Sequence, residues 1–354
     1  MQIKNIEIWK ADLGLTRPYS IAGESTSSTE NAFLRIELTN GHWGIGSAAP
    51  SERVCNERME DTMAGLEKGA ERLKGKDVGA FEALKSAIAE ELIDTPAARA
   101  AIDMALYDVF CKSLDVRVVD YLGQKHTSLP TSITIGIKED QGVKADLEEF
   151  IAKGFSIVKI KIGTDVERDI SILKKLREWG GSAIKIRVDA NQGYSKIHLA
   201  ELIQETRGVG LEFVEQPYFA PALVQMRDLS EGIRSQCMAD EDLKSRSDAV
   251  AMTRGPLPYG SWNIKLMKSG GVTGGKWIGD LAGMYGIPLM WGCMDESRVS
   301  IAAALHTAFS CRATQYLDLD GSFDLATDVV TGGFEVKDGI MYLTDAPGLG
   351  VKSL

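Results

Sequence analysis

The first part of the chain alternates between apolar and polar positions. Residues 3–9 and 32–38 have this period of two, which is typical of β-strands that bury one face. Asn40-Gly41 follows the second of these segments and is typical of a tight hairpin turn. The first 50 residues therefore predict antiparallel strands.

Residues 57–122 have the longer spacing of helices and are rich in alanine and glutamate. Thr95-Pro96 predicts the start of one helix, with Thr95 as the N-cap and Pro96 at the first helical position. Strands followed by helices predict an α+β unit over residues 1–125.

After this unit the pattern changes to short, β-branched apolar runs with helical segments between them. The runs begin about 25 to 28 residues apart. They cover residues 132–137, 157–162, 184–188, 211–214, 236–239, 262–266, 287–291 and 314–319. Strands and helices alternating at this period form βαβ units, and eight units in series can close a parallel barrel.

The chain is longer than a single barrel. It has 354 residues, roughly 100 more than the about 250 that a barrel needs, and these have to be placed around it. Residues 322–354 contain no further strong helix, and their Gly-Gly, Asp-Gly and Pro-Gly pairs indicate turns. We expect a unit over residues 1–125, a barrel over 126–321, and a last segment over 322–354 that packs back on the first unit.

The composition is that of a folded globular protein, with 44% hydrophobic and 25% charged residues. The chain carries 40 lysines and arginines against 50 aspartates and glutamates, so its formal net charge is −10. Such an acidic chain binds polyanions poorly, which argues against nucleic acid and anionic membranes as partners.

Five widely spaced cysteines, without a Cys-x-x-Cys pair, indicate a reducing compartment, and we expect the cytoplasm. The alternating N-terminal segment predicts a strand rather than a signal peptide. No apolar run approaches the length of about 18 residues that a membrane span needs. The oligomeric state stays open, a homo-oligomer included.

Charged residues stand at the ends of five consecutive predicted strands. Lys161 is followed by Asp189, Glu215, Asp240 and Lys265 at steps of 28, 26, 25 and 25 residues. Equivalent positions of adjacent barrel strands converge at the C-terminal end of the barrel, where barrel enzymes hold their sites. Three carboxylates there form a set of hard oxygen ligands for one Mg²⁺, without the histidine or cysteine that zinc favours.

Lys161 and Lys265 flank the carboxylates in strand order and would face each other across the metal. Mg²⁺ can hold a substrate carboxylate and stabilise the enediolate that forms when the adjacent C–H loses its proton. One neutral lysine takes that proton, and we expect Mg²⁺ and the neighbouring Lys159 to lower its pKa. The other lysine returns a proton to the opposite face, so the pair predicts a racemase or an epimerase.

Each of these residues alone has a simpler interpretation. A single aspartate at a strand end is usually a turn or cap residue, and a lysine in the loop after a strand is usually solvated. We interpret Lys268, which follows the sixth predicted strand beside Gly270-Gly271, as such a solvated charge. The four histidines have no spacing partners and are interpreted as structural or surface residues.

These motifs resemble those of the enolase superfamily, muconate-lactonising subgroup, over nearly the whole chain. The matching segments are Lys159-Ile-Lys161, Val-Asp189-Ala-Asn-Gln-Gly, Val-Glu215-Gln-Pro, Met-Ala-Asp240-Glu241, Asn-Ile-Lys265-Leu-Met-Lys-Ser-Gly-Gly and the closing Pro-Gly-Leu-Gly. The resemblance implies a (β/α)7β modified TIM barrel. It also implies that the N-terminal α+β unit caps this barrel and that a loop near residues 15–30 covers the substrate.

Asp318-Leu-Asp320 on the eighth predicted strand resembles the Asp-x-Asp signature of dipeptide epimerases. Two carboxylates two residues apart face one side of a strand and can bind the α-ammonium of a dipeptide, whose own carboxylate would bind Mg²⁺. The pair would repel the anionic substrates of cycloisomerases and succinylbenzoate synthases. A pair of turn caps before Gly321 is the simpler alternative. Thr134 matches a substrate-contact position of the same group.

The covering loop departs from the Ala-Glu type of epimerase at one position. Those enzymes carry an arginine where this chain has Glu24, and that arginine pairs with the glutamate side chain of their substrate. An acid there should reject anionic side chains by like-charge repulsion. With Glu52 and Asp295 as further acids nearby, we predict a preference for dipeptides that contain lysine or arginine, or are at least non-acidic.

Glu24 also has a simpler interpretation, in which it faces solvent or pairs with Arg17 or Arg53. The residues predicted to bind substrate are Glu24, Thr134, Lys159, Cys293, Asp295, Asp318 and Asp320.

The sequence thus predicts an isomerase, a Mg²⁺-dependent dipeptide epimerase that inverts the α-carbon of the C-terminal residue. Its alternatives are an N-acylamino acid racemase, a cycloisomerase or an o-succinylbenzoate synthase of the same subgroup. A lyase that forms a Schiff base on Lys161 or Lys265, and a binding scaffold without catalysis, are less closely related possibilities.

Overall fold

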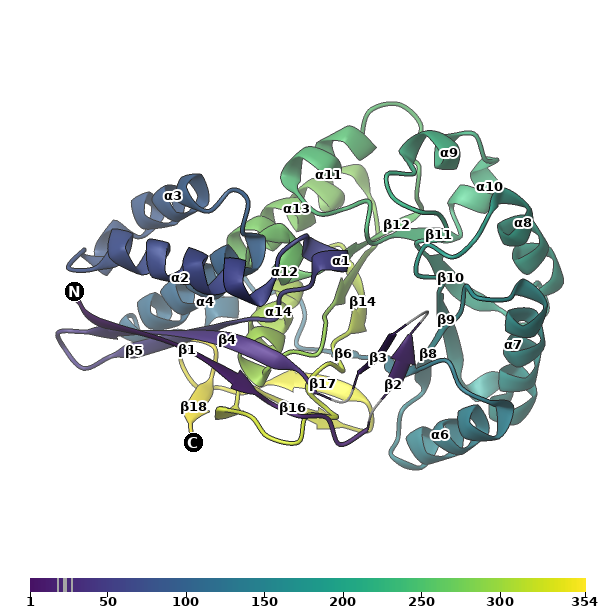
Figure 1. The fold of residues 1–354 in the computed structure, drawn as a ribbon, viewed down its shortest axis with the longest axis horizontal. Helices are drawn as coiled ribbons and strands as arrows, with labels where there is room; N and C mark the ends of the chain where they lie inside the picture. The colour runs from purple at the N-terminus through teal and green to yellow at the C-terminus, as the bar shows by residue number, and fades with distance from the viewer. Residues whose placement is uncertain (18, 22–23, 27) are drawn as a thin grey trace.

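The computed structural model describes residues 1–17, 19–21, 24–26 and 28–354, and it describes no side chain from residue 18 to residue 27. The N-terminal part, here called the cap, is built on an antiparallel sheet in the order β1-β4-β5, with helices packed against it (Figure 1). Its strands are β1 (Ile3–Asp12), β4 (Glu30–Leu38) and β5 (Trp43–Ala48), and the hairpin β2 (Tyr19–Ile21) and β3 (Glu24–Thr26) lies between β1 and β4 in sequence. These strands confirm the antiparallel pattern predicted for the first 50 residues.

The cap has one buried helix, α4, with other helices beside it. The helices of the cap are α1 (Glu52–Cys55), α2 (Met59–Leu73), the 3-10 turn η1 (Val78–Ala80), α3 (Phe81–Glu91), α4 (Pro96–Ser113) and α5 (Val118–Leu122). Glycines of β5 let α4 approach the sheet closely: a Cβ atom on Gly46 would lie 1.8 Å from the carbonyl oxygen of Ala101. Main-chain contact of this kind fixes α4 between the sheet and the barrel.

The start of α4 differs from the prediction in one respect. Pro96 is the first helical residue and Thr95 stands at the N-cap, but the Thr95 side chain makes no capping hydrogen bond. The carboxylate of Glu57 does so instead, since it accepts from the main-chain N–H groups of Ala97 and Ala98 at 2.6 and 3.0 Å. The side chain that caps the start of this helix therefore belongs to a residue about 40 positions earlier in the chain.

The second part of the chain is a parallel eight-stranded sheet in sequential order, as the eight predicted runs required. The strands are β7 (Ile133–Ile135), β8 (Ile157–Lys161), β9 (Lys185–Asp189), β10 (Leu211–Glu215), β11 (Cys237–Ala239), β12 (Ser261–Ile264), β13 (Leu289–Gly292) and β14 (Thr314–Asp318). A parallel bridge between Thr131 and Leu317 joins the last strand to the chain entering the first, which closes the barrel.

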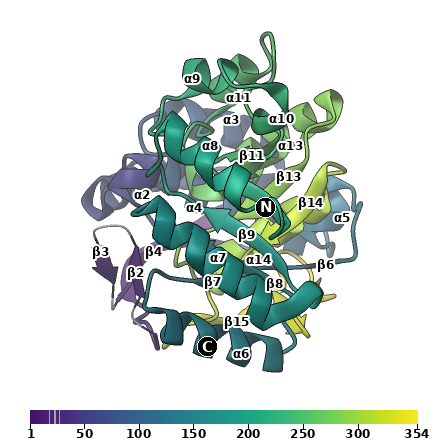
Figure 2. The same ribbon diagram turned by 90° about the vertical axis from the view of Figure 1, so that its right-hand side faces the viewer.

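Helices follow the barrel strands on the outside, and Figure 2 shows α6, α7 and α8 side by side over the strands they connect. They are α6 (Asp140–Ala152), α7 (Val166–Gly180), η2 (Gly181–Ala183), α8 (Lys196–Glu205), α9 (Leu223–Arg227), α10 (Glu231–Arg234), α11 (Arg246–Met252), α12 (Leu266–Ser269), α13 (Val272–Tyr285) and α14 (Arg298–Phe309). No helix of the described part follows β14, so the barrel has the predicted (β/α)7β form.

The segment after the barrel forms four short strands instead of the eighth helix. They are β15 (Val330–Gly332), β16 (Phe334–Lys337), β17 (Ile340–Leu343) and β18 (Val351–Ser353). β17 pairs with β6 (Ser128–Pro130), and β15 pairs with β18. The same segment contacts the cap, because the N–H of Leu349 donates to the carboxylate of Asp108 in α4 at 2.8 Å.

One continuous hydrophobic core runs through the cap and the barrel helices. A small second group, Phe213, Met238 and Met290, fills the interior of the barrel itself. Within the described part of the chain, no helix has the length and the apolar character needed to cross a membrane.

Candidate active site

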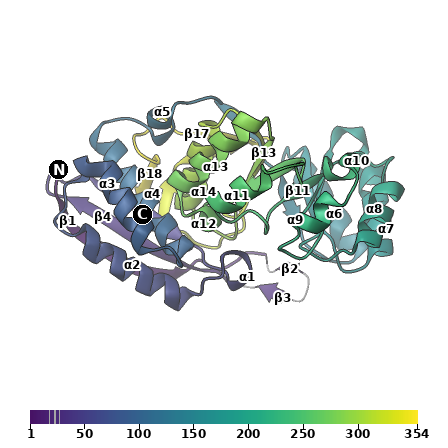
Figure 3. The same cartoon turned by 90° about the horizontal axis from the view of Figure 1, so that it is seen from above.

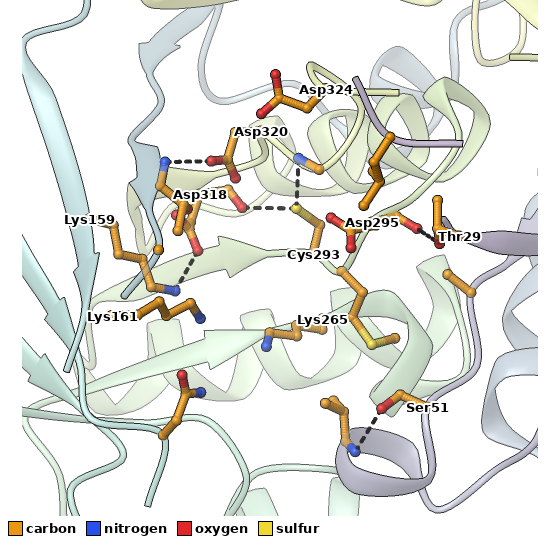
Figure 4. A pocket seen from close by; sticks show the side chains of 18 of the residues that line it. Thr29, Ser51, Lys159, Lys161, Lys265, Cys293, Asp295, Asp318, Asp320 and Asp324 are labelled. Atoms are coloured by element: carbon orange, nitrogen blue, oxygen red, sulfur yellow. Dashed lines mark hydrogen bonds and ion pairs between the residues drawn. The ribbon is translucent and has the colours of Figure 1, made fainter. Parts of the chain in front are cut away.

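A cavity of about 360 Å³ lies where the C-terminal ends of the barrel strands meet the cap. Charged side chains from the strand ends line its floor (Figure 4). On its other side the cap contributes Leu15, Arg17, Thr29, Glu30, residues 49–51, Arg53 and Val54. Both parts of the chain are therefore needed to enclose it.

The three predicted metal ligands stand at the ends of neighbouring strands. Asp189 and Glu215 are the last residues of β9 and β10 and are paired in register, while Asp240 follows β11 directly. All three side chains are buried. Burial raises the pKa of Glu215, and the charges of Asp189 and Asp240 raise it further, so the three carboxylates lie close enough to repel one another.

Lys161 and Lys265 lie on opposite sides of this carboxylate group. Lys161 Nζ is 2.7 Å from Asp189 Oδ2, and Lys265 Nζ is 2.7 Å from Asp240 Oδ2. Figure 4 shows their two side chains approaching from opposite sides with the ammonium ends toward one another. The structure thus brings together the five residues that the strand-end spacing singled out.

Lys159 occupies a different environment from Lys161, two residues further on. Its Nζ lies 2.7 Å from Asp318 Oδ2, 2.8 Å from Glu215 Oε2 and 3.3 Å from Asp189 Oδ2. Burial lowers the pKa of Lys159, but these three carboxylates outweigh burial and hold the pKa well above its ordinary value. Lys159, which lines the cavity, is therefore a fixed positive charge in its floor.

The interpretation of Lys268 as a solvated charge is wrong. The side chain is buried, and its Nζ contacts Asp240 Oδ1 and donates to the main-chain oxygen of Asp240 at 2.6 Å. The short helix α12 carries it there, because this helix turns the chain back under the end of β12. Lys268 thus compensates the charge of Asp240 from the side opposite to the cavity.

For Lys265, the charges of the protein itself do not produce the lowered pKa that was expected for one of the two lysines. Burial lowers the pKa of Lys265, but the carboxylates of Asp240 and Glu215 raise it by more, and the net shift is upward. Asp240 shows the opposite shift. Burial raises its pKa, but the charges of Lys265 and Lys268 outweigh burial and lower it.

The donor set of the three carboxylates fits a magnesium ion by its chemistry. The ligands are hard oxygens without histidine or cysteine, and the buried Glu215 Oε2 accepts no hydrogen bond, with only the Lys159 ammonium beside it. As the side chains stand, Asp189 and Asp240 are turned toward lysines, and within the described residues no three acidic, histidine or cysteine side chains surround a common point.

Asp318 and Asp320 both line the cavity, but their partners differ. Asp318 is engaged by Lys159 and by the hydroxyl of Ser132, which donates to it at 2.6 Å. Asp320 accepts the main-chain N–H of Thr134 at 2.7 Å. Burial and the charge of Asp318 raise the pKa of Asp320 above its ordinary value.

Cys293 and Asp295 lie on the loop after β13 and line the cavity. Cys293 Sγ accepts from the N–H of Gly321 at 3.3 Å and donates to the oxygen of Asp318 at 3.2 Å, which ties this loop to the end of β14. The main-chain oxygen of Asp295 accepts from Thr29 and Asn31 of the cap, at 3.3 and 3.2 Å.

Glu24 and Glu52 are two of the acids that were expected near the side chain of the substrate, and the structure answers differently for each. Glu24 lies in β3, and its side chain lies outside the described residues. Glu52 does not line the cavity: its side chain is 75% exposed and lies 3.9 Å from Arg58. Of the arginines considered as partners of Glu24, Arg17 is engaged by Glu149 and Asp324, and Arg53 donates to the main-chain oxygen of Asn191.

The cavity also contains charged residues that the sequence pattern did not single out. Gln192 donates to the carboxylate of Glu241 at 3.2 Å beside the metal-ligand candidates. At the outer side, the acids Glu30, Asp146 and Asp324 line the cavity. Glu241 stands in the segment Met-Ala-Asp240-Glu241 noted above but was given no role there, whereas Glu30, Asp146 and Asp324 come from β4, α6 and the loop after β14 without a shared spacing.

The fold and this arrangement define a class of enzyme, and comparison with known proteins agrees. Residues 142–353 match the enolase C-terminal domain-like family, and residues 5–123 match the N-terminal domain of the mandelate racemase / muconate lactonizing enzyme family. The chain belongs to this family within the enolase superfamily.

Its relatives include dipeptide epimerases of full length. The chain is 50% identical over 355 residues to the L-Lys-D/L-Arg epimerase of Desulforapulum autotrophicum, with 100% of both chains covered. It is 32% identical over 357 residues to the L-Ala-D/L-Glu epimerase of Bacillus subtilis, with 99% of this chain and 97% of the relative covered. A crystal structure of the dipeptide epimerase from Methylococcus capsulatus, complexed with Mg and L-Arg-D-Lys, superposes with a TM-score of 0.97 at 43% identity, covering 99% of each chain.

Proposed function

We propose that this protein is a Mg²⁺-dependent dipeptide epimerase that inverts the α-carbon of the C-terminal residue and prefers dipeptides with lysine or arginine side chains. The observation that carries the reaction type is the pair Lys161 and Lys265 on opposite sides of one carboxylate-lined cavity. The names of the similar enzymes, which act on Lys-Arg, Ala-Glu and hydrophobic dipeptides, support the substrate class.

Proton transfer follows from the positions of the two lysines. One lysine removes the α-proton of the bound dipeptide from one face, and the other delivers a proton to the opposite face, which inverts the centre. Mg²⁺ held by Asp189, Glu215 and Asp240 supplies stabilisation of the negative charge that develops on the substrate carboxylate. Lys159 stays charged beside Glu215 and Asp189, and Lys268 holds the carboxylate of Asp240 in place.

The other end of the substrate is assigned to Asp318 and Asp320. An α-ammonium is a strong partner for a carboxylate that no lysine pairs with, and Asp320 is such a group because, among the described residues, it forms no ion pair and accepts from Thr134. Asp318 shares its charge with Lys159, so its part is to orient the neighbouring Asp320. Thr134 fixes Asp320 through its main chain.

The preference for cationic side chains rests on the charges of the outer cavity. Asp295 on the barrel loop and Glu24 on the covering hairpin are the proposed partners of a substrate lysine or arginine, and Cys293 shapes the wall between them. Acids at this side attract a cation and repel a glutamate side chain. Among the relatives with full-length matches, two act on Lys-Arg dipeptides by name.

We further propose that the chain is organised as the cap over residues 1–125, the barrel over 126–321 and the returning segment over 322–354. The contact between Leu349 and Asp108 supports the return of the last segment to the cap. We also infer a reducing, cytoplasmic compartment, because all five cysteines are free thiols.

One experiment tests this function directly. A dipeptide library is incubated with the protein and Mg²⁺ in D₂O, and the gain of mass at the α-carbon is measured. We expect one deuterium in the C-terminal residue, faster for Xaa-Lys and Xaa-Arg than for Xaa-Glu, and none after EDTA treatment until Mg²⁺ is restored.

Three controls separate the alternatives. N-acetylation of a good dipeptide should slow the reaction sharply; an unchanged rate would indicate an N-acylamino acid racemase. Borohydride should trap no adduct on Lys161 or Lys265, whereas a Schiff-base lyase would be trapped. Absence of exchange with every peptide would leave a binding scaffold, and faster turnover of Xaa-Glu would contradict the cationic preference alone.

A further inference from the structure

A second cavity, of about 240 Å³, lies between the cap and the barrel, outside the candidate active site. Residues of α3 and α4 line it on the cap side, and residues at the starts of α11 and α13 line it on the barrel side. Figure 3 shows α4 beside α12 and α13, with α11 next to them. None of its lining residues also lines the candidate active site.

Two arginines in this cavity form no ion pair among the described residues. Arg99 of α4 donates no side-chain hydrogen bond and pairs with no carboxylate among those residues, although it is half-buried. In the same part of the chain, Arg246 contacts the main-chain oxygen of Thr273, at 3.4 Å, and the ring of Trp277. Burial lowers the pKa of Arg99, the carboxylate of Asp103 raises it, and Arg246 lies near enough to lower it further.

The two guanidinium groups repel each other, and neither forms an ion pair with a carboxylate among the described residues, although acids are abundant in a chain of net charge −10. Further donors lie around the same space. The ammonium of Lys85 lies at its edge, held by Glu82 at 2.8 Å and by the hydroxyl of Tyr107 at 3.0 Å. The hydroxyls of Ser245 and Ser247, 2.7 Å apart, line the barrel side.

The acid in this cavity, Asp103, is held by Thr273 and forms no ion pair with either arginine, although its charge acts on Arg99. Both carboxylate oxygens of Asp103 bind Thr273, one on its N–H at 2.9 Å and one on its hydroxyl at 2.6 Å. Gly270 leaves room for Arg99, because a Cβ atom there would lie 2.0 Å from Arg99 Nε, and its φ of +75° is one that glycine adopts readily. The backbone thus leaves space for an arginine that forms no ion pair among the described residues.

We propose that this cavity binds a small phosphate-type oxyanion, either free phosphate or the phosphate group of a small metabolite, between Arg99 and Arg246. Guanidinium groups from α4 and from the start of α11, with the hydroxyls of Ser245 and Ser247 beside Arg246, border the space, which suits a tetrahedral anion better than a planar carboxylate. The volume admits one phosphate group with a small substituent. The proposal is independent of the reaction in the other cavity.

Binding of inorganic phosphate to the full-length protein in the presence of Mg²⁺ tests the proposal. We expect saturable binding by calorimetry and a rise of the melting temperature that sodium chloride at equal ionic strength does not reproduce. Arg99→Gln and Arg246→Gln should each weaken binding about tenfold or more, as expected for the loss of a charge-assisted contact. Arg207→Gln, at an exposed arginine, is the matched control and should bind as the wild type does.

Arg246→Gln keeps the test decisive if Arg99→Gln does not fold, since Arg246 lies at the surface end of the cavity. Phosphate binding that is absent, or equal in wild type and Arg246→Gln, would overturn the proposal. Malonate bound more tightly than phosphate would overturn the assignment to a tetrahedral anion. Glycerol phosphate bound more tightly than phosphate would support a phosphorylated metabolite, and the reverse order would support free phosphate.

A crystal soaked in selenate gives the position of the anion independently. The anomalous signal of selenium is expected between Arg99 and Arg246. A signal only at Lys161 and Lys265 would contradict the proposal.

Discussion

The four lysines around the metal-ligand candidates differ in the groups that surround them. Lys159 contacts three carboxylates that keep it protonated, and Lys268 contacts Asp240 twice, so both side chains are held in place. Lys161 and Lys265 each contact one carboxylate and border the open cavity. Only these two can exchange a proton with a substrate.

Replacement of either bordering lysine should therefore stop inversion. We expect Lys161→Ala and Lys265→Ala each to reduce the rate of epimerisation by about a hundredfold to ten-thousandfold, the usual contribution of a general acid or base. One variant should still exchange the α-proton of a single stereoisomer in D₂O, followed by mass spectrometry and polarimetry. Lys196→Ala, at an exposed lysine, is the control, and normal epimerisation by either active-site variant would rule out the two-base assignment.

His306 gives a prediction about stability rather than activity. It is buried in α14, and its Nδ1 accepts the N–H of Val119 at 3.0 Å. Burial lowers its pKa from 6.5 to about 3. The folded state therefore requires neutral histidine, so its contribution is complete above pH 6.5 and is lost as the pH falls toward 3, by about 1.4 kcal/mol per unit.

The variant His306→Asn keeps an acceptor near Nδ1 but cannot titrate. We expect its free energy of unfolding, measured by urea denaturation between pH 4 and pH 7, to depend less on pH than that of the wild type. His42→Asn, at an exposed histidine, should keep the wild-type slope. An unchanged slope in His306→Asn would show that this histidine titrates normally in the fold.

The spacing of charged residues along the sequence predicted those site residues that stand at equivalent positions of the barrel strands. It could not predict the contacts of residues that lie elsewhere. Asp189, Glu215 and Asp240 recur with the period of the barrel, and that period is a local property of the chain. The burial of Lys268 depends on the turn of α12 beneath β12, which its neighbours in sequence do not indicate. The sequence could not show that Asp318 is shared with Lys159, because that contact joins residues 159 positions apart.

At the level of elements, α4 shows how a helix can depend on a residue outside it. The Glu57 carboxylate binds the first free N–H groups of this helix, and it also accepts from the hydroxyl of Thr62 at 2.6 Å. Pro96 at the first position is compatible with this arrangement, since proline has no N–H to satisfy. The first turn of α4, the buried helix of the cap, is therefore stabilised by a side chain from the segment that precedes it.

Removal of that side chain should destabilise the protein. We expect Glu57→Ala to lower the free energy of unfolding by about 1–3 kcal/mol, because two N–H groups lose their acceptor in a buried place. Chemical denaturation measures this, with the exposed Glu60→Ala as the matched control. A loss no greater in Glu57→Ala than in Glu60→Ala would contradict the capping role.

The eight barrel strands were predictable because each is a short apolar run that repeats at a nearly constant interval. The four strands after the barrel were not, since they are three or four residues long and pair with each other or with the distant β6. A segment of this length has too little periodicity to be distinguished from a loop.

At the level of the whole molecule, the cap and the barrel meet at the loop after β13. Asn31 of β4 donates to the main-chain oxygen of Asp295 at 3.2 Å and accepts the N–H of Ser297 at 3.0 Å. Asn31 is fully buried, so these bonds have no water to replace them. The cap thus fixes the loop that carries Cys293 and Asp295.

Loss of this contact should affect substrate binding more than chemistry. We expect Asn31→Ala to lower the free energy of unfolding by about 1–3 kcal/mol. It should raise KM for dipeptides by a larger factor than it lowers kcat, because the lysines stay on their strands. Steady-state kinetics with the control Asn5→Ala, an exposed asparagine of β1, checks this. An equal fall of kcat with unchanged KM would contradict it.

The contact between Asn31 and the loop has a consequence for how specificity can change among related enzymes. On the loop side it uses only main-chain atoms of residues 295 and 297, so this contact does not require a particular side chain at 295. Substitutions there can alter the charge presented to the substrate while the cap stays docked. A family with this arrangement can acquire new dipeptide preferences by single mutations, without any change in its fold.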